Sequence, residues 1–161
     1  MDIQLKLVTR QVNLDLPSRT LVPEFNQPEY NITKASFTGN LLRYLPHRSE
    51  DYQNIAIVVS EKTRLCGYPE YLPWLTEILQ QQGALKENIH FYIAYGTHPP
   101  QSDEESLKTY GSVFKEYHFV HHDCTDDSVF DIPGTTKSGT SVTVRKDILK
   151  STLLITFGAI S

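Results

Sequence analysis

The sequence has few cysteines, no surplus of basic charge and no long apolar run. Its 161 residues include two cysteines, Cys66 and Cys124, and neither belongs to a Cys-x-x-Cys pair. This scarcity argues against a disulfide framework, a zinc knuckle and a thioredoxin-type redox site. Lysine and arginine number 15 against 19 aspartate and glutamate residues, and the net charge is −4. Because basic residues are not clustered, the sequence predicts no nucleic-acid partner and no binding to an anionic membrane surface.

Every apolar run is too short to cross a bilayer, so the sequence predicts no integral membrane protein. The N-terminal residues MDIQLKLVTRQ alternate polar and apolar side chains and lack the apolar core of a secretory signal. Together with the scarce cysteines, this pattern predicts a cytoplasmic location. With 39% hydrophobic residues the chain can bury one core, and its length favours a single domain over residues 1–161.

The first 34 residues are typical of β structure. Apolar side chains alternate with polar ones at Ile3, Leu5, Leu7, Val12, Leu14 and Leu16. Turns are expected at Pro17, Pro23 and Pro28. We therefore expect an N-terminal β-hairpin region over residues 1–34 as an extension within the domain. A short helix is expected to follow over residues 35–44, ended by Pro46.

From residue 55 onward, strand and helix patterns alternate. Strands are expected over residues 55–59, 89–94, 117–120 and 153–157, and the first and last are apolar runs typical of strands buried on both faces. Helices are expected over residues 69–82 and from the capping box of Ser102 and Glu105 to Gly111, and an antiparallel hairpin over residues 130–144. The predicted fold class is α/β, with a mostly parallel, Rossmann-like layered sheet and helices on both faces.

Residues suited to ligand chemistry follow two of the expected strands. Arg64 ends the loop 60–64, and its planar guanidinium fits a carboxylate or a phosphate. In the loop 95–100, Gly96 allows the backbone to approach a ligand closely, and His98 can act as an acid or base near neutral pH. Ligands of open α/β sheets gather at the carboxyl ends of the strands, where both loops lie. An ordinary solvated loop and a solvent-facing histidine remain the alternatives.

Two further segments resemble known binding sites but lack the spacing or the residues that those sites require. The cluster from His118 to Asp123 suggests a metal, but on a strand His118 and His122 share one face and His121 points to the other. The segment 134–141 imitates a phosphate-binding loop, but Thr140 stands where the lysine should be and a β pattern follows instead of a helix. We therefore expect neither a mononuclear metal site nor a nucleoside triphosphate site.

Five segments together resemble the N-terminal domain of nickel-pincer lactate racemases, from about residue 10 onward. They are V-S-E-K-T-R (59–64), A-Y-G-T-H-P (94–99), H-H-D (121–123), G-T-T-K-S-G-T-S-V (134–142) and L-L-I-T-F-G-A-I (153–160). The resemblance implies racemisation of a 2-hydroxy acid, in which a nickel-pincer nucleotide takes up and returns a hydride. Two histidines act as acid and base on the substrate hydroxyl. His98 matches one of these histidines, and Arg64 matches the arginine that holds the substrate carboxylate. The remaining expected substrate-binding residues are Glu61, Thr63, Gly96 and Thr97.

The resemblance also implies a second part of the enzyme. In the family, the second catalytic histidine, the lysine joined to the cofactor and the histidine that ligates nickel all follow the strand expected at 153–157. We therefore expect no metal ligand within these residues, and a C-terminal domain without which this substrate-side domain is inactive. Glu61, Leu65 and Pro99 replace the usual aspartate, proline and arginine, which fits a paralogue acting on another 2-hydroxy acid. A non-enzymatic anion- or nucleotide-binding regulatory domain and a protein-interaction domain remain the alternatives.

Overall fold

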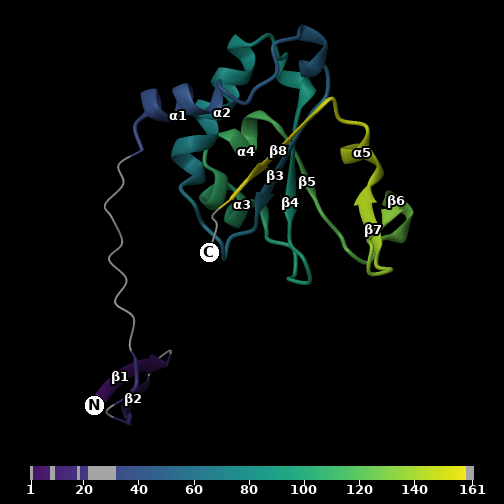
Figure 1. Cartoon of the computed structure of the whole chain (residues 1–161). Helices are drawn as coiled ribbons and strands as arrows, with labels where there is room; N and C mark the ends of the chain where they lie inside the picture. Colours follow the sequence, from purple (N-terminus) through teal and green to yellow (C-terminus); the bar gives the residue numbers. More distant parts are fainter. Residues whose placement is uncertain (1, 8–9, 18, 22–31, 159–161) are drawn as a thin grey trace. The chain divides into compact units, whose positions relative to one another are not determined.

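The computed structural model describes residues 2–7, 10–17, 19–21 and 32–158, and the chain forms two compact units, residues 1–31 and 32–161. The first unit contains an antiparallel hairpin of β1 (Asp2–Leu7) and β2 (Arg10–Asp15), in which Leu5 lies opposite Val12 (Figure 1). The period-two alternation of apolar residues therefore forms the hairpin that the sequence predicts. The turns expected at Pro23 and Pro28 lie outside the described residues.

The second unit is built on a four-stranded parallel sheet in the order β5-β4-β3-β8 (Figure 1). Its strands are β3 (Ile55–Ser60), β4 (Ile89–Ala94), β5 (His118–His121) and β8 (Leu153–Phe157). Short 3-10 helices span Ser49–Tyr52 before β3, Lys86–Asn88 before β4 and Asp127–Val129 after β5. The sheet confirms the predicted α/β class, and its parallel strands bring all their carboxyl ends to one edge.

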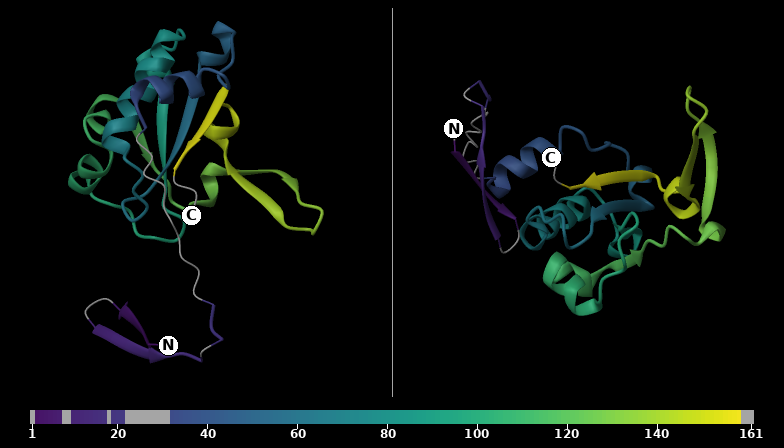
Figure 2. Two further views of the ribbon diagram at one scale, coloured as in Figure 1. Left: turned by 60° about the vertical axis from the view of Figure 1, so that its left-hand side comes forward. Right: turned by 90° about the horizontal axis from the view of Figure 1, so that it is seen from below.

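One face of the sheet carries the hydrophobic core. Four helices pack there: α1 (Lys34–Leu41), α2 (Tyr68–Gln81), α3 (Asp103–Tyr110) and α4 (Val113–Glu116) (Figure 2). Ile57 and Phe91 of the sheet are fully buried against Leu72 and Leu79 of α2. The predicted capping box begins α3, because the Ser102 hydroxyl accepts the Glu105 N–H at 3.2 Å and the Glu105 carboxylate accepts the Ser102 N–H at 2.9 Å.

The second face of the sheet is only partly covered. The predicted hairpin, β6 (Phe130–Thr135) and β7 (Ser141–Arg145), and the single-turn helix α5 (Lys146–Leu149) lie on this side (Figure 2). Leu154 of β8 is 51% exposed, so the expectation that the strand at 153–157 is buried on both faces is wrong. The reason is topological: β8 is an edge strand, and only its alternate residues Leu153, Ile155 and Phe157 pack against the core.

Within the described ranges, no helix is both long enough and apolar enough to traverse a lipid bilayer. Cys66 and Cys124 are both free thiols.

Candidate functional site

A cavity of about 390 Å³, which we call the rim cavity, opens where β3 and β4 end. It is lined by the following residues of the two loops and the strand ends: Ser60, Glu61, Arg64, Ala94, Tyr95, Gly96, Thr97 and His98. The structure thus brings Glu61, Arg64, Gly96, Thr97 and His98, all expected site residues, to one place. Thr63 reaches the same place through its bonds to Glu61.

Tight turns hold both loops against the strand ends. The Arg64 N–H donates to the Glu61 carbonyl at 3.1 Å, and the His98 N–H donates to the Tyr95 carbonyl at 3.0 Å. Gly96 has a φ of 59°, in the left-handed region that favours glycine. The chain can therefore reverse directly after β4 and present His98 beside the loop that follows β3.

Glu61 is a buried carboxylate in the wall of the rim cavity, with only 4% of its surface exposed. Its Oε2 accepts the Thr63 N–H at 2.8 Å, and its Oε1 accepts the Thr63 hydroxyl and lies 3.2 Å from Nδ1 of His98. Burial raises the pKa of Glu61, but the hydrogen bonds from Thr63 and His98 outweigh it, so the pKa lies below its ordinary value. Glu61 is therefore an anion near neutral pH.

His98 is oriented by Glu61 and remains accessible, since 52% of its side chain is exposed. A carboxylate accepts hydrogen bonds, so Nδ1 is the protonated nitrogen of the neutral imidazole. That tautomer leaves Nε2 with a free lone pair, as a proton acceptor needs.

Arg64 is exposed and its guanidinium has no carboxylate partner within the described part of the chain. Its neighbour Lys62 differs, because its ammonium pairs with the Glu105 carboxylate of α3. Of the two cations in this loop, Arg64 is thus the one available to an anionic ligand, and its planar fork can bind a carboxylate through two hydrogen bonds.

Gln101 joins the two loops to α3 from a buried position, with 5% of its surface exposed. Its Oε1 accepts the Lys62 N–H at 3.0 Å, its Nε2 donates to the Ser106 hydroxyl at 3.0 Å, and its backbone N–H donates to the Tyr95 hydroxyl at 3.3 Å. The sequence analysis missed Gln101, because a glutamine in a polar loop has no periodicity that would reveal its burial.

Two buried tyrosines hold the end of β3. The Tyr68 hydroxyl accepts the Ser60 N–H at 2.7 Å and donates to the Phe157 carbonyl at 3.1 Å, while the Tyr110 hydroxyl donates to the Ser60 carbonyl at 2.9 Å. Burial raises the pKa of Tyr68 to about 12 and also raises that of Tyr110. Both hydroxyls therefore stay protonated and fix the start of the 60–64 loop. The sequence pattern placed Tyr110 in an expected helix and Tyr68 directly before another, and it gave no sign of these hydrogen bonds.

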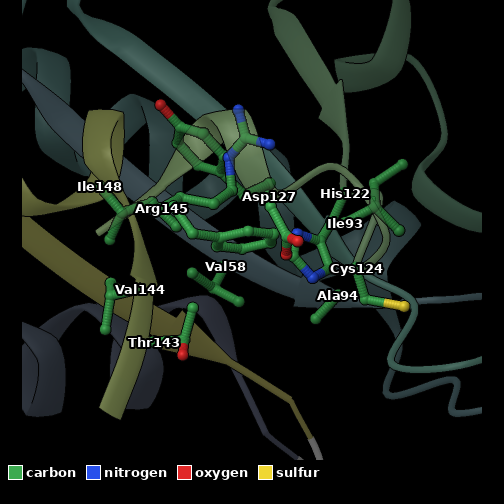
Figure 3. Close-up of a pocket in the computed structure, with 12 residues that line it drawn as sticks. Val58, Ile93, Ala94, His122, Cys124, Asp127, Thr143, Val144, Arg145 and Ile148 are labelled. Atoms are coloured by element: carbon green, nitrogen blue, oxygen red, sulfur yellow. The ribbon is translucent and has the colours of Figure 1, made fainter. Parts of the chain in front are cut away.

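A larger cavity of about 510 Å³, the second-face cavity, lies between the sheet and the β6–β7 hairpin (Figure 3). Its walls are mostly apolar: Val58, Tyr92, Ile93, Phe130, Val144 and Ile148. Polar groups come from Arg145, His122, Asp127, Thr143 and Cys124. No sequence pattern predicts this cavity, because its residues are distant in sequence and come together only when the segment between β5 and β8 folds against the sheet.

The histidines near β5 alternate as predicted. His118 and His122 line cavities on the second face, whereas His121 stacks on Tyr95, with Nδ1 2.6 Å from the Tyr95 hydroxyl. Among the residues that the structure describes, no group of three or more His, Cys, Asp or Glu side chains is placed to hold a metal ion.

The fold and the rim cavity define an α/β domain with a cavity at the carboxyl edge of its sheet, lined by the Arg64 guanidinium and the His98 imidazole. A sequence profile of the lactate racemase N-terminal domain matches residues 8–161, and the chain belongs to this family. The family predicted from the five sequence segments is thereby confirmed. No curated protein matches the chain in sequence.

Several solved structures share the fold, including the following two. One is the lactate racemase apoprotein from Thermoanaerobacterium thermosaccharolyticum, at 20% identity and a TM-score of 0.70, with 97% of this chain and 38% of that chain covered. The other is the crystal structure of a Thermotoga maritima protein, at 18% identity and a TM-score of 0.57, with 74% of this chain and 31% of that chain covered. The chain therefore spans well under half the length of either protein.

Proposed function

We propose that this chain is the substrate-side domain of a racemase or epimerase of 2-hydroxy acids. A free guanidinium at Arg64 and a carboxylate-oriented imidazole at His98 line one cavity, and this observation carries the proposal. A 2-hydroxy acid offers the two complementary groups, a carboxylate and a hydroxyl on the next carbon. Arg64 binds the carboxylate, and His98 exchanges the proton of the hydroxyl.

The roles of the other expected residues follow from their contacts. Glu61 and Thr63 were expected to bind substrate, but the Glu61 carboxylate binds Thr63 and His98, and its charge would repel an anionic substrate. Glu61 is better suited to orient the His98 ring, and Thr63 to hold Glu61. Gly96 and Thr97 form the turn that carries His98 into the cavity.

The family implies a nickel-pincer nucleotide in the complete enzyme. The described residues do not fit its metal site, since they contain no suitable cluster of three ligands. We propose that a further domain carries the cofactor, and that the residues of this chain bind the substrate and move the hydroxyl proton.

The test is a titration of the 15N-labelled chain with lactate, followed by NMR. We expect the backbone signals of residues 60–64 and 95–98 to shift, with a dissociation constant that Arg64→Ala raises about ten- to hundredfold, because a hydrogen bond to a charged group contributes about 1.5–3 kcal/mol. Lys62→Ala is the matched control, since it removes the neighbouring cation, which is already paired with Glu105. Equal losses in both variants, or none in Arg64→Ala, would contradict the assignment of Arg64.

A further inference from the structure

Residues at the ends of β3 and β4 line more than one cavity. A third cavity, of about 340 Å³, is lined by Val58, Ser60 and Ala94 together with the end of β8. It shares Ser60 and Ala94 with the rim cavity, and Val58 and Ala94 with the second-face cavity. Ala94 lines all three. The three cavities therefore meet at one small side chain.

The register of β3 and β4 explains which side chains separate the rim cavity from the second-face cavity. Ser60 lies opposite Ala94 at the rim, and Val58 lies opposite Tyr92 two residues earlier, so all four side chains point to the second face. Two residues of strand span about 7 Å. Because Ser60 and Ala94 are small, a ligand group anchored at the rim can extend over this distance into the second-face cavity.

The chemistry of the second-face cavity selects an apolar occupant. The Arg145 guanidinium is already bound to Asp147, from Nε to Oδ1 at 3.0 Å and from Nη2 to Oδ2 at 2.7 Å. It also lies over the Tyr92 ring, 5.7 Å from the ring centre. The Asp127 carboxylate would repel a second acidic group. Burial and the Arg145 charge lower the pKa of His122, which keeps this imidazole neutral.

We propose that the substrate is a 2-hydroxy acid with a branched or aromatic apolar side chain, and that this side chain passes Ala94 to occupy the second-face cavity. The inference rests on the proposed function, because it needs the carboxylate at Arg64. Lactate would leave the second-face cavity unfilled, and a dicarboxylic hydroxy acid would bring a charge to walls that offer it no free cation.

The test compares lactate, malate, 2-hydroxy-4-methylpentanoate and 3-phenyllactate by NMR titration of the methyl-labelled chain. Each buried methylene should tighten binding about fourfold. The two large apolar acids should therefore bind at least tenfold more tightly than lactate, and malate should not. Their titration should shift the methyl signals of Val144 and Ile148, whereas lactate should shift signals at the rim alone.

Val58→Phe places a ring where the third cavity meets the second-face cavity, at a residue that does not line the rim cavity, and should remove the advantage of the large acids while leaving lactate affinity within about twofold. The control Val120→Phe adds the same ring beside Tyr92 on β5, at a position that lines none of the three cavities, and should keep the advantage. Equal affinity for lactate and 3-phenyllactate in the wild-type chain, or no shift at Val144 and Ile148, overturns this inference alone. A failure of all four acids to bind overturns the proposed function together with it.

Discussion

Replacing Glu61 by glutamine tests whether the buried carboxylate organises the site. Glutamine keeps the size of the side chain but turns one acceptor oxygen into an NH₂ donor. In the folded protein the Thr63 N–H donates to one carboxylate oxygen of Glu61, and the Thr63 hydroxyl and His98 donate to the other. Whichever oxygen becomes NH₂, the new donor faces a donor. The variant therefore loses at least one hydrogen bond to a charged acceptor and leaves a donor without a partner.

The expected cost is about 2.5–6 kcal/mol of unfolding free energy at pH 7, since a charged hydrogen bond contributes about 1.5–3 kcal/mol and an unpaired donor costs about 1–3 kcal/mol. The control Glu77→Gln removes a carboxylate whose ion pair with Lys34 is 48% exposed, and it should cost less than about 1 kcal/mol. Urea unfolding of the three proteins measures both values.

The pH dependence provides a second check of Glu61. Because its pKa is lower in the folded chain than in the unfolded chain, its stabilisation is complete above the unfolded value of about 4.3 and is lost as the pH falls through the folded value. The stability difference between the wild type and Glu61→Gln should therefore shrink in acid. A difference that stays constant from pH 7 to pH 3, or a variant as stable as the wild type, would refute this account of Glu61.

Two other positions give independent predictions. Gln101→Leu leaves the Lys62 N–H and the Ser106 hydroxyl without their partner and should lower the unfolding free energy by about 1–3 kcal/mol, while broadening the NMR signals of residues 60–64. Gly111→Ala brings a Cβ to 3.1 Å from the Pro69 Cα at a φ of +68°, and should cost about 1–3 kcal/mol in thermal unfolding. Gly39→Ala, in α1 with nothing within 4 Å of its Cβ, should instead stabilise by about 0.5–1 kcal/mol. A Gly111→Ala protein as stable as the wild type would show that the turn after α3 is not strained.

The elements of the fold were predictable because their patterns are local. The apolar run 55–59, the helical spacing over 69–82 and the capping box at Ser102 each depend on neighbours in the sequence. The exposure of Leu154 was not predictable, because an edge strand and a central strand can both be apolar runs. What differs is the strand order, which depends on long-range pairing.

The candidate site was predictable only in part. Arg64 and His98 could be placed at one edge because parallel strands share a direction. The burial of Glu61 was not predictable, since a glutamate in a polar loop is usually solvated and only the Thr63 and His98 contacts explain its position. The passage at Ala94 depends on the register of β3 and β4, which no local pattern specifies.

The most direct test of the central claim is the kinetic comparison of His98→Asn and Arg64→Ala in the complete enzyme that the proposed function requires. His98→Asn should lower kcat by about two to four orders of magnitude with little change in KM, the usual effect of losing a positioned acid–base group. Arg64→Ala should mainly raise KM, about ten- to hundredfold. If His98→Asn keeps a wild-type kcat, or if it raises KM as Arg64→Ala does, His98 does not exchange the hydroxyl proton and the account is wrong.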